Sequence, residues 1–194
     1  AIWYASYGRI SGSRLGGIKA LRECSDIAIE KSDIQSPEFG WNSRRISLED
    51  TSLVSEYAFL NASDLTVKGL TFSGKYSFQY VNNMTIEDSV LDTKDAFWHS
   101  RNVTVKNSVI KGEYLAWYGK NIRLVRCHLT GEQLLCYVDG LILEDCTFGE
   151  DANLILEYST VNGTIKGNVH SIKNPTSGTV IVEGKVGELI WDEK

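Results

Sequence analysis

The sequence contains only two prolines, four cysteines and one methionine in 194 residues, and no apolar run approaches the ~20 residues that a membrane-spanning helix needs. Asp and Glu (25) outnumber Lys and Arg (20), so the basic excess that a nucleic-acid groove requires is missing. A hydrophobic fraction of 42% argues against disorder. We therefore expect a folded protein that binds neither nucleic acid nor a membrane.

A 19-residue repeat runs through most of the chain. Each unit opens with a short aliphatic segment whose first residue recurs 19 positions later. These first residues are Ile27, Ile46, Leu65, Met84, Val103, Ile122 and Leu141. Three further apolar columns keep the same register, and the pattern extends over eight units. Such self-similarity indicates a repeat protein in which neighbouring units share one core.

Within each unit, apolar and polar residues alternate, as in the segment 103–106, which is the period of a half-buried strand. A column of turn residues follows: Gly17, Ser36, Ser55, Gly74, Thr93, Gly112 and Gly131. A 19-residue unit with about three short strands is typical of one coil of a parallel β-helix. Leucine-rich repeats are longer, and left-handed β-helices have a hexapeptide period. We therefore predict an all-β, single-stranded, right-handed parallel β-helix.

The rhythm changes after Tyr158, and a turn cluster follows at 174–178. We predict that residues 1–158 form the coils and that residues 159–194 cover the open end of the solenoid as a C-terminal β cap. The chain opens inside the repeat and has no signal-like segment, so we also expect additional N-terminal coils before Ala1.

Several segments carry a resemblance to a known family. They are residues 94–100, 112–118, 135–137, 157–161 and 171–175. These segments resemble an uncharacterised bacterial family of unknown function that is similar in fold to the pectin-lyase-like right-handed β-helices. The likeness covers nearly the whole chain, and members of that family carry additional N-terminal coils. The resemblance implies the fold, and it implies no activity and no catalytic residue.

Aromatic residues gather in neighbouring columns. One holds Trp3, Trp41, Trp98 and Trp117, the next holds Tyr4, Tyr80, His99, Tyr118 and Tyr137, and a third holds Tyr57, Tyr76 and Tyr114. If strand alternation about Phe97 continues, the tryptophan column faces outward. Planar rings near carboxylates suit contacts with sugars. The predicted ligand-binding residues are Trp98, His99, Trp117, Tyr118, Tyr137, Asp95 and Glu113. The alternatives are core packing and a homo-oligomer contact through the aromatic face.

Paired carboxylates would favour a glycan-cleaving enzyme instead. Asp50 and Asp88 share a column two coils apart, hence ~9.6 Å along the backbone, which is near the separation in inverting glycosidases. However, Gly69 lies between them, and no acidic cluster surrounds Arg44 or Arg45. The sequence therefore provides no set of catalytic residues, and a polysaccharide lyase or glycoside hydrolase remains the alternative.

Histidines and cysteines provide no metal or cofactor site. His99, His128 and His170 fall in different columns. The cysteines are Cys24, Cys127, Cys136 and Cys146, without a C-x-x-C pair. Cys127 and Cys146 share a column of small residues, where we expect two free buried thiols and hence a reducing, cytoplasmic setting. The leading hypothesis is a non-catalytic module that recognises carbohydrate or a related polymer, and a structural or oligomerisation scaffold is a further alternative.

Overall fold

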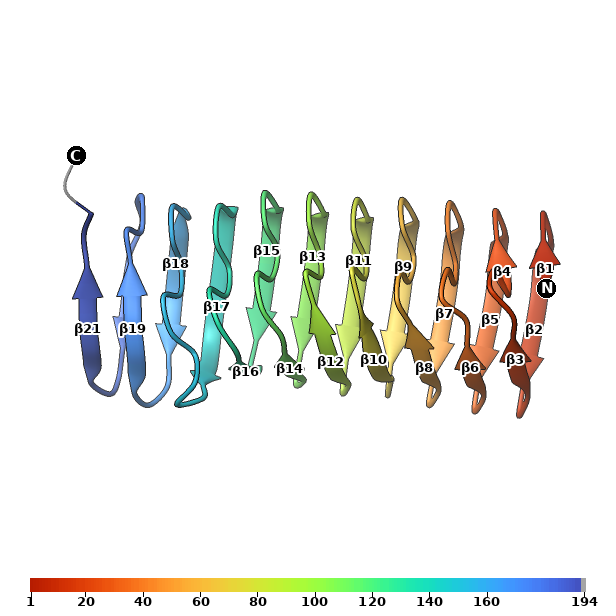
Figure 1. Ribbon diagram of the computed structural model, residues 1–194, viewed down its shortest axis with the longest axis horizontal. Coiled ribbons are helices and arrows are strands. Elements are labelled where there is room, and N and C mark those ends of the chain that lie inside the picture. The colour runs from red at the N-terminus through yellow and green to blue at the C-terminus, as the bar shows by residue number, and fades with distance from the viewer. Residues whose placement is uncertain (193–194) are drawn as a thin grey trace.

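The computed structural model describes residues 1–192 and shows an elongated stack of parallel β turns (Figure 1). The strands are β1 (Ile2–Trp3), β2 (Ser6–Ser11), β3 (Arg14–Gly16), β4 (Leu21–Arg22), β5 (Ser25–Glu30), β6 (Asp33–Gln35), β7 (Arg44–Glu49), β8 (Ser52–Ser55), β9 (Ser63–Lys68), β10 (Thr71–Lys75), β11 (Asn82–Glu87), β12 (Val90–Lys94), β13 (Arg101–Lys106), β14 (Val109–Lys111), β15 (Lys120–Val125), β16 (His128–Thr130), β17 (Asp139–Phe148), β18 (Val161–Ile165), β19 (Val169–Lys173), β20 (Val180–Val182) and β21 (Val186–Ile190). No helix within residues 1–192 is long and apolar enough to cross a membrane. The all-β prediction is confirmed.

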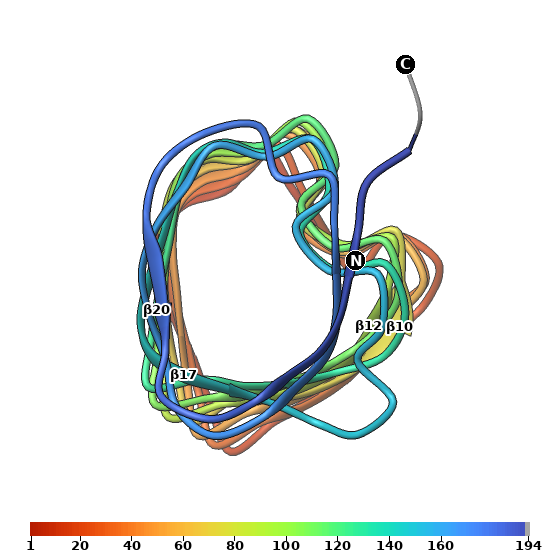
Figure 2. The same ribbon diagram turned by 90° about the vertical axis from the view of Figure 1, so that its left-hand side faces the viewer.

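Strand pairing follows the predicted 19-residue register. In the first sheet, Ile27 pairs with Ile46, and Met84 pairs with Val103, always in parallel. A second sheet repeats the arrangement with β3, β6, β8, β10, β12, β14 and β16. Viewed along its length, the rod presents successive turns almost superimposed (Figure 2). The parallel β-helix with 19-residue turns is therefore confirmed.

The core is a set of columns that run along the inside of the rod. Phe59, Phe78 and Phe97 are buried in consecutive turns, with ring centroids 5.9 and 5.4 Å apart and nearly parallel planes. The aliphatic residues that recur every 19 positions in the first sheet, from Ile27 to Leu141, are also buried. Each turn therefore buries its apolar face against two neighbours, as stacked repeats require.

Polar ladders hold the turns in register. Ser89 Oγ accepts a hydrogen bond from the amide of Leu70 in the preceding turn and donates one to the carbonyl of Glu87. Outside, the side-chain amide of Asn121 donates to Asn102 at 3.2 Å. Asn102 and Asn121 have positive φ, as expected for residues that tolerate the left-handed region.

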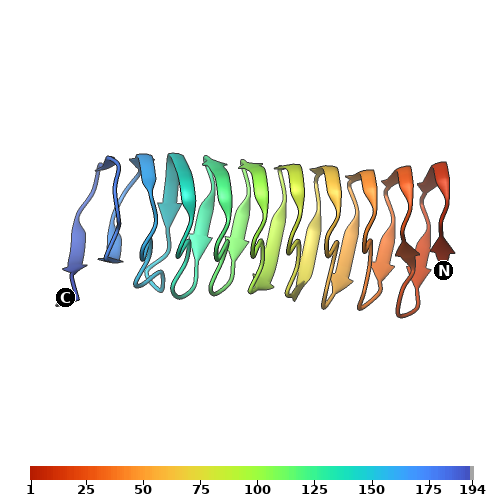
Figure 3. The same ribbon diagram turned by 90° about the horizontal axis from the view of Figure 1, so that it is seen from above.

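The change of rhythm after Tyr158 corresponds to shorter turns. Gly163 pairs with Val180 and Val169 pairs with Val186, both 17 residues apart and parallel. Strands β18–β21 therefore continue the parallel stack beyond the last 19-residue turn, as seen from above in Figure 3. The division into coils at 1–158 and a cap at 159–194 stays a prediction. Residues 193–194 of that expected segment lie outside the described part of the chain.

Candidate functional site

Five rings from consecutive turns stack along the outside of the rod, and we call them the aromatic ladder. The ladder consists of Tyr80, His99, Tyr118, Tyr137 and Tyr158. Neighbouring centroids lie 4.9, 5.4, 5.2 and 5.1 Å apart in that order. The first two pairs are nearly parallel, at 9° and 17°. Because the rings cover one another's faces, the ladder presents ring edges, hydroxyls and an imidazole to solvent.

The backbone positions the ladder just before each first-sheet strand. The amide of Tyr80 donates to the carbonyl of Trp98 in the next turn, and that of His99 donates to Trp117, both at 2.8 Å. All five ladder residues have positive φ, between 52° and 57°. Asn42 and Asn61 occupy the same column in earlier turns, also with positive φ. Asparagine tolerates this region readily, whereas a bulky ring does so at a cost.

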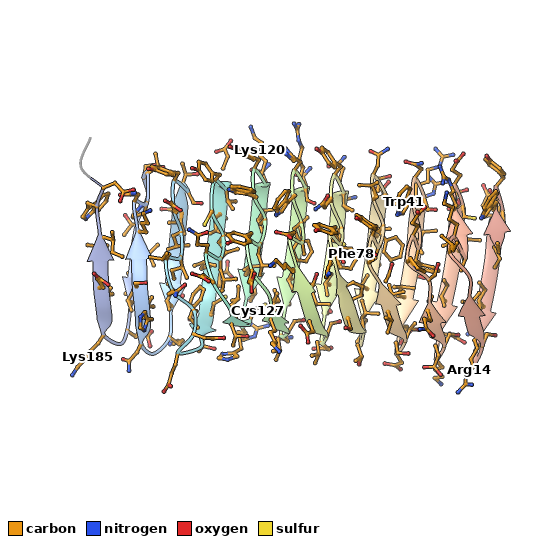
Figure 4. All side chains as sticks on the ribbon, in the orientation of Figure 1. Arg14, Trp41, Phe78, Lys120, Cys127 and Lys185 are labelled. Atoms are coloured by element: carbon orange, nitrogen blue, oxygen red, sulfur yellow. The ribbon has the colours of Figure 1, made fainter. Side chains whose placement is uncertain are left out.

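The indoles of the tryptophan column are partly covered by neighbouring turns, and none of the four belongs to the buried core: Trp3 is 49% exposed. Trp41, Trp98 and Trp117 are half-buried. The indole N–H of Trp98 donates to the carbonyl of Tyr114 at 2.7 Å, and that of Trp41 donates to Tyr57 at 2.5 Å. Figure 4 places Trp41 against its neighbouring turns. These indoles therefore connect adjacent turns, and Trp117 packs against the ladder ring of Tyr118.

An open groove of about 550 Å³ lies at the N-terminal end of the ladder. Its lining residues are Asn61, Tyr80, Val81, Asn82, His99, Arg101, Asn102 and Tyr118. Tyr80 is the first ring of the ladder, because the preceding turn has the short side chain of Asn61 in the same column. No ring of the described residues packs on that side of Tyr80, which is 54% exposed. The groove thus combines the exposed phenol of Tyr80 with amide groups, and Tyr80 is about as exposed as Tyr118 (55%), which has rings on both sides.

The two acidic residues of the predicted site lie apart from this groove. Asp95 is buried, and burial raises the pKa of its carboxyl above the usual value. Glu113 forms an ion pair with Lys94 at 2.6 Å, and this partner raises the pKa of Lys94. Neither carboxylate lines the ladder groove. The structure therefore brings His99 and Tyr118 together at the groove, and it extends the ladder to Tyr137.

Sequence reasoning placed Tyr80 in the correct column but did not select it, and it missed Tyr158 and Arg101. The 19-residue column does not include Tyr158, because Tyr158 lies 21 residues after Tyr137. Extra residues between β16 and β18 shift the register, since Leu141 pairs with Val161. An aromatic residue two places before a strand identifies the first four rings of the ladder, and Tyr158 lies three places before β18.

The other candidate residues have structural surroundings. Asp50 and Asp88 have positive φ at the turn between the two sheets. No group of three or more metal-ligating side chains occurs within residues 1–192. All four cysteines are free and buried, as predicted for Cys127 and Cys146. The contact between these two thiols lowers the pKa of Cys127 and raises the pKa of Cys146.

Comparison with known proteins gives a family and two distant fold neighbours. No curated protein matches the sequence significantly. Among solved structures, GH136 lacto-N-biosidase from Eubacterium ramulus is 10% identical with a TM-score of 0.43, over 90% of this chain and 50% of that one. PfbA, a surface adhesin of Streptococcus pneumoniae, is 6% identical with a TM-score of 0.41, over 86% and 71% of the two chains. The chain thus spans about half the length of the lacto-N-biosidase. The model of a family described as "protein of unknown function (DUF3737)" matches residues 1–194, and the chain belongs to that family.

Proposed function

We propose that the protein is a non-catalytic carbohydrate-recognition module and that the saccharide binds in the groove at the N-terminal end of the aromatic ladder. The observation that carries the proposal is the groove in which the exposed ring of Tyr80 meets the side-chain amides of Asn61, Asn82 and Asn102. An aromatic face offers a flat apolar surface to the C–H groups of a sugar ring, while the phenol retains a polar tip. Sites for small ligands combine such surfaces with a few placed polar groups.

The amides around Tyr80 supply the polar groups. Asn61 donates its N–H to Asn42 at 3.0 Å, which leaves its carbonyl oxygen free to accept from a sugar hydroxyl. Asn82 accepts from Asn102 at 3.0 Å and keeps its own N–H groups for a ligand oxygen. The groove around Tyr80 therefore offers an acceptor on Asn61 and donors on Asn82 to the hydroxyls of a bound sugar.

The ladder also offers a place for a longer chain. From Tyr80 to Tyr158 it crosses four steps between turns, or ~19 Å at the usual strand spacing. A polymer that lies along the rod would contact successive phenol hydroxyls of Tyr118, Tyr137 and Tyr158. Affinity should therefore rise with the length of the oligosaccharide and then level off.

The test replaces ladder rings by the residue that the same column uses elsewhere. Tyr80→Asn should lower oligosaccharide affinity by tenfold or more, because it removes the stacking surface and leaves a side chain suited to positive φ. Tyr4→Asn is the matched control: Tyr4 is in the same column, has a φ of 57° and is 72% exposed, but lies four turns away. Tryptophan fluorescence, reported by Trp98 and Trp117 beside the ladder, measures binding to a panel of neutral and acidic oligosaccharides.

The control variant and the panel decide the outcome. Equal binding by the native protein and Tyr80→Asn would refute the site. A flat response of the native protein across the whole panel would refute carbohydrate recognition and leave the aromatic face as a protein interface, which light scattering would then detect as a stable oligomer.

A further inference from the structure

The groove beside the ladder carries one cation and no carboxylate. Arg101 begins β13, two residues after His99, and it is exposed. No Asp or Glu lines the groove, although acidic residues outnumber basic ones in the whole chain. Within residues 1–192, no carboxylate lies within 4.0 Å of the Arg101 guanidinium. None of these described residues therefore neutralises the positive charge at this position.

Neighbouring cations on the rod are held by carboxylates of the adjacent turn. Lys120 follows Arg101 in the same column and pairs with Asp139 at 3.2 Å. Arg123 pairs with Glu144 at 2.6 Å. Figure 4 shows Lys120 at the long edge of the rod, pointing away from it. Arg101 has the same place one turn toward the N-terminus, but its two neighbours in the column are Asn82 and Lys120, and neither is an acid.

We infer that Arg101 makes the groove selective for saccharides that bear an acidic group, either a carboxylate or a sulfate. This inference rests on the proposed function. The planar guanidinium presents two parallel N–H groups that match two oxygens of such an anion, and these charge-assisted bonds are stronger than bonds to neutral groups. Tyr80 lies two residues before Asn82 in one turn, and Arg101 pairs with Asn82 from the next turn. All three line the same groove, so a saccharide that lies along it can contact Tyr80 with one sugar while an acidic group of the chain reaches Arg101.

The experiment compares a ligand with and without its charge. The probes are an oligomer of glucuronic acid, the same oligomer with its carboxyl groups methyl-esterified, and a sulfated neutral oligosaccharide, each measured by calorimetry. The native protein should bind the acid about 10- to 100-fold more tightly than the ester at low salt. That preference should shrink as ionic strength rises, because the site is open to solvent.

Arg101→Gln should abolish the preference by weakening binding of the acidic probes, so that the acid and the ester bind with similar affinity. Arg44→Gln is the matched control, since Arg44 lies in the same column, is exposed, and stands three turns away, beside Asn42 in place of an aromatic ring. It should bind as the native protein does. Circular dichroism would verify that both variants keep the strand content of the native protein.

The outcomes separate this inference from the proposed function. Equal affinity of the native protein for the acid, the ester and the sulfated probe, or a preference that persists in Arg101→Gln, would overturn the inference and leave carbohydrate recognition intact. Absence of binding by every saccharide, neutral ones included, would overturn both. Tight binding of the sulfated probe, with no preference for the uronate over its ester, would assign sulfate as the acidic group. Preference for the uronate over its ester, with weak binding of the sulfated probe, would assign carboxylate.

Discussion

The glycines of the turn column provide a direct test of how closely the turns are stacked. At Gly131, with a φ of +116°, an added Cβ would lie 1.6 Å from the carbonyl oxygen of Gly112 in the preceding turn. Gly17 stands in the same column with a φ of +105°, but an added Cβ there meets no atom within 4 Å. Gly131→Ala therefore combines backbone strain with a collision, whereas Gly17→Ala introduces the strain alone.

The two contributions can be estimated separately. Positive φ in alanine costs ~1–2 kcal/mol in both variants. Since real Cβ contacts below 3.0 Å are essentially absent, Gly131→Ala must move the turns apart by 1.4 Å (3.0 minus 1.6). This displacement weakens the bond from the Gly112 amide to Thr130, now 3.0 Å long, and disturbs the packing around it. Overpacking and a weakened hydrogen bond together add ~2–4 kcal/mol.

Urea unfolding followed by circular dichroism measures the total loss, and hydrogen exchange locates it, because stacked repeats can open locally. Gly74→Ala supplies a third comparison: it lies outside the positive-φ region, and its Cβ would lie 1.7 Å from the Ser55 carbonyl. We expect Gly131→Ala to be the most destabilising of the three. Equal losses for Gly17→Ala and Gly131→Ala, with unchanged exchange in residues 112–131, would refute the reasoning.

Three other substitutions or reactions test the core. Phe78→Ala should cost ~3–5 kcal/mol in urea unfolding, because it empties the middle of a fully buried ring stack, and a loss below ~1 kcal/mol would contradict that packing. Burial raises the pKa of Asp95, so its charged form destabilises the fold above that pKa. Asp95→Asn should therefore raise the Tm near pH 7 but not near pH 3, where the carboxyl is protonated in both folded and unfolded chains; a gain that persists in acid would argue against burial as the cause. Cys127 and Cys146 are 2% and 0% exposed, so maleimide should label them only in denaturant, and fast labelling of the folded protein would contradict their placement.

Much of the fold could be predicted because one constraint repeats. Every apolar column must be buried in every turn, so a single register fixes the pairing of Ile27 with Ile46 and of their successors. The orientation of Trp98 could not be obtained in this way. Phe97 and His99 on either side of it have φ values of 62° and 54°, and the alternation of a pleated strand does not extend through left-handed residues. The indole consequently turns toward the next turn, where its N–H finds a carbonyl.

The C-terminal part of the site escaped sequence analysis for a different reason. A column is visible in a sequence only while the period is constant, and the insertion before β18 moves Tyr158 two positions out of register. In space Tyr158 still stacks on Tyr137 at 5.1 Å. Stacking between turns therefore preserves the ladder across a change that hides it in the sequence.

The ladder places rings at left-handed backbone positions that asparagine occupies in two earlier turns. Left-handed backbone in a bulky residue costs ~1–3 kcal/mol, while a stacked aromatic pair returns ~0.5–1.5 kcal/mol. Asparagine, found at Asn42 and Asn61 in the same column, avoids most of that cost and still forms a side-chain ladder at 3.0 Å. Five successive rings are thus a more expensive solution than the one that the same chain uses in earlier turns. The same left-handed backbone occurs at the exposed Tyr4 and in the buried core at Phe78 and Phe97. The backbone alone therefore does not mark a binding surface, and it is the replacement of asparagine by successive exposed rings that the proposed site would explain.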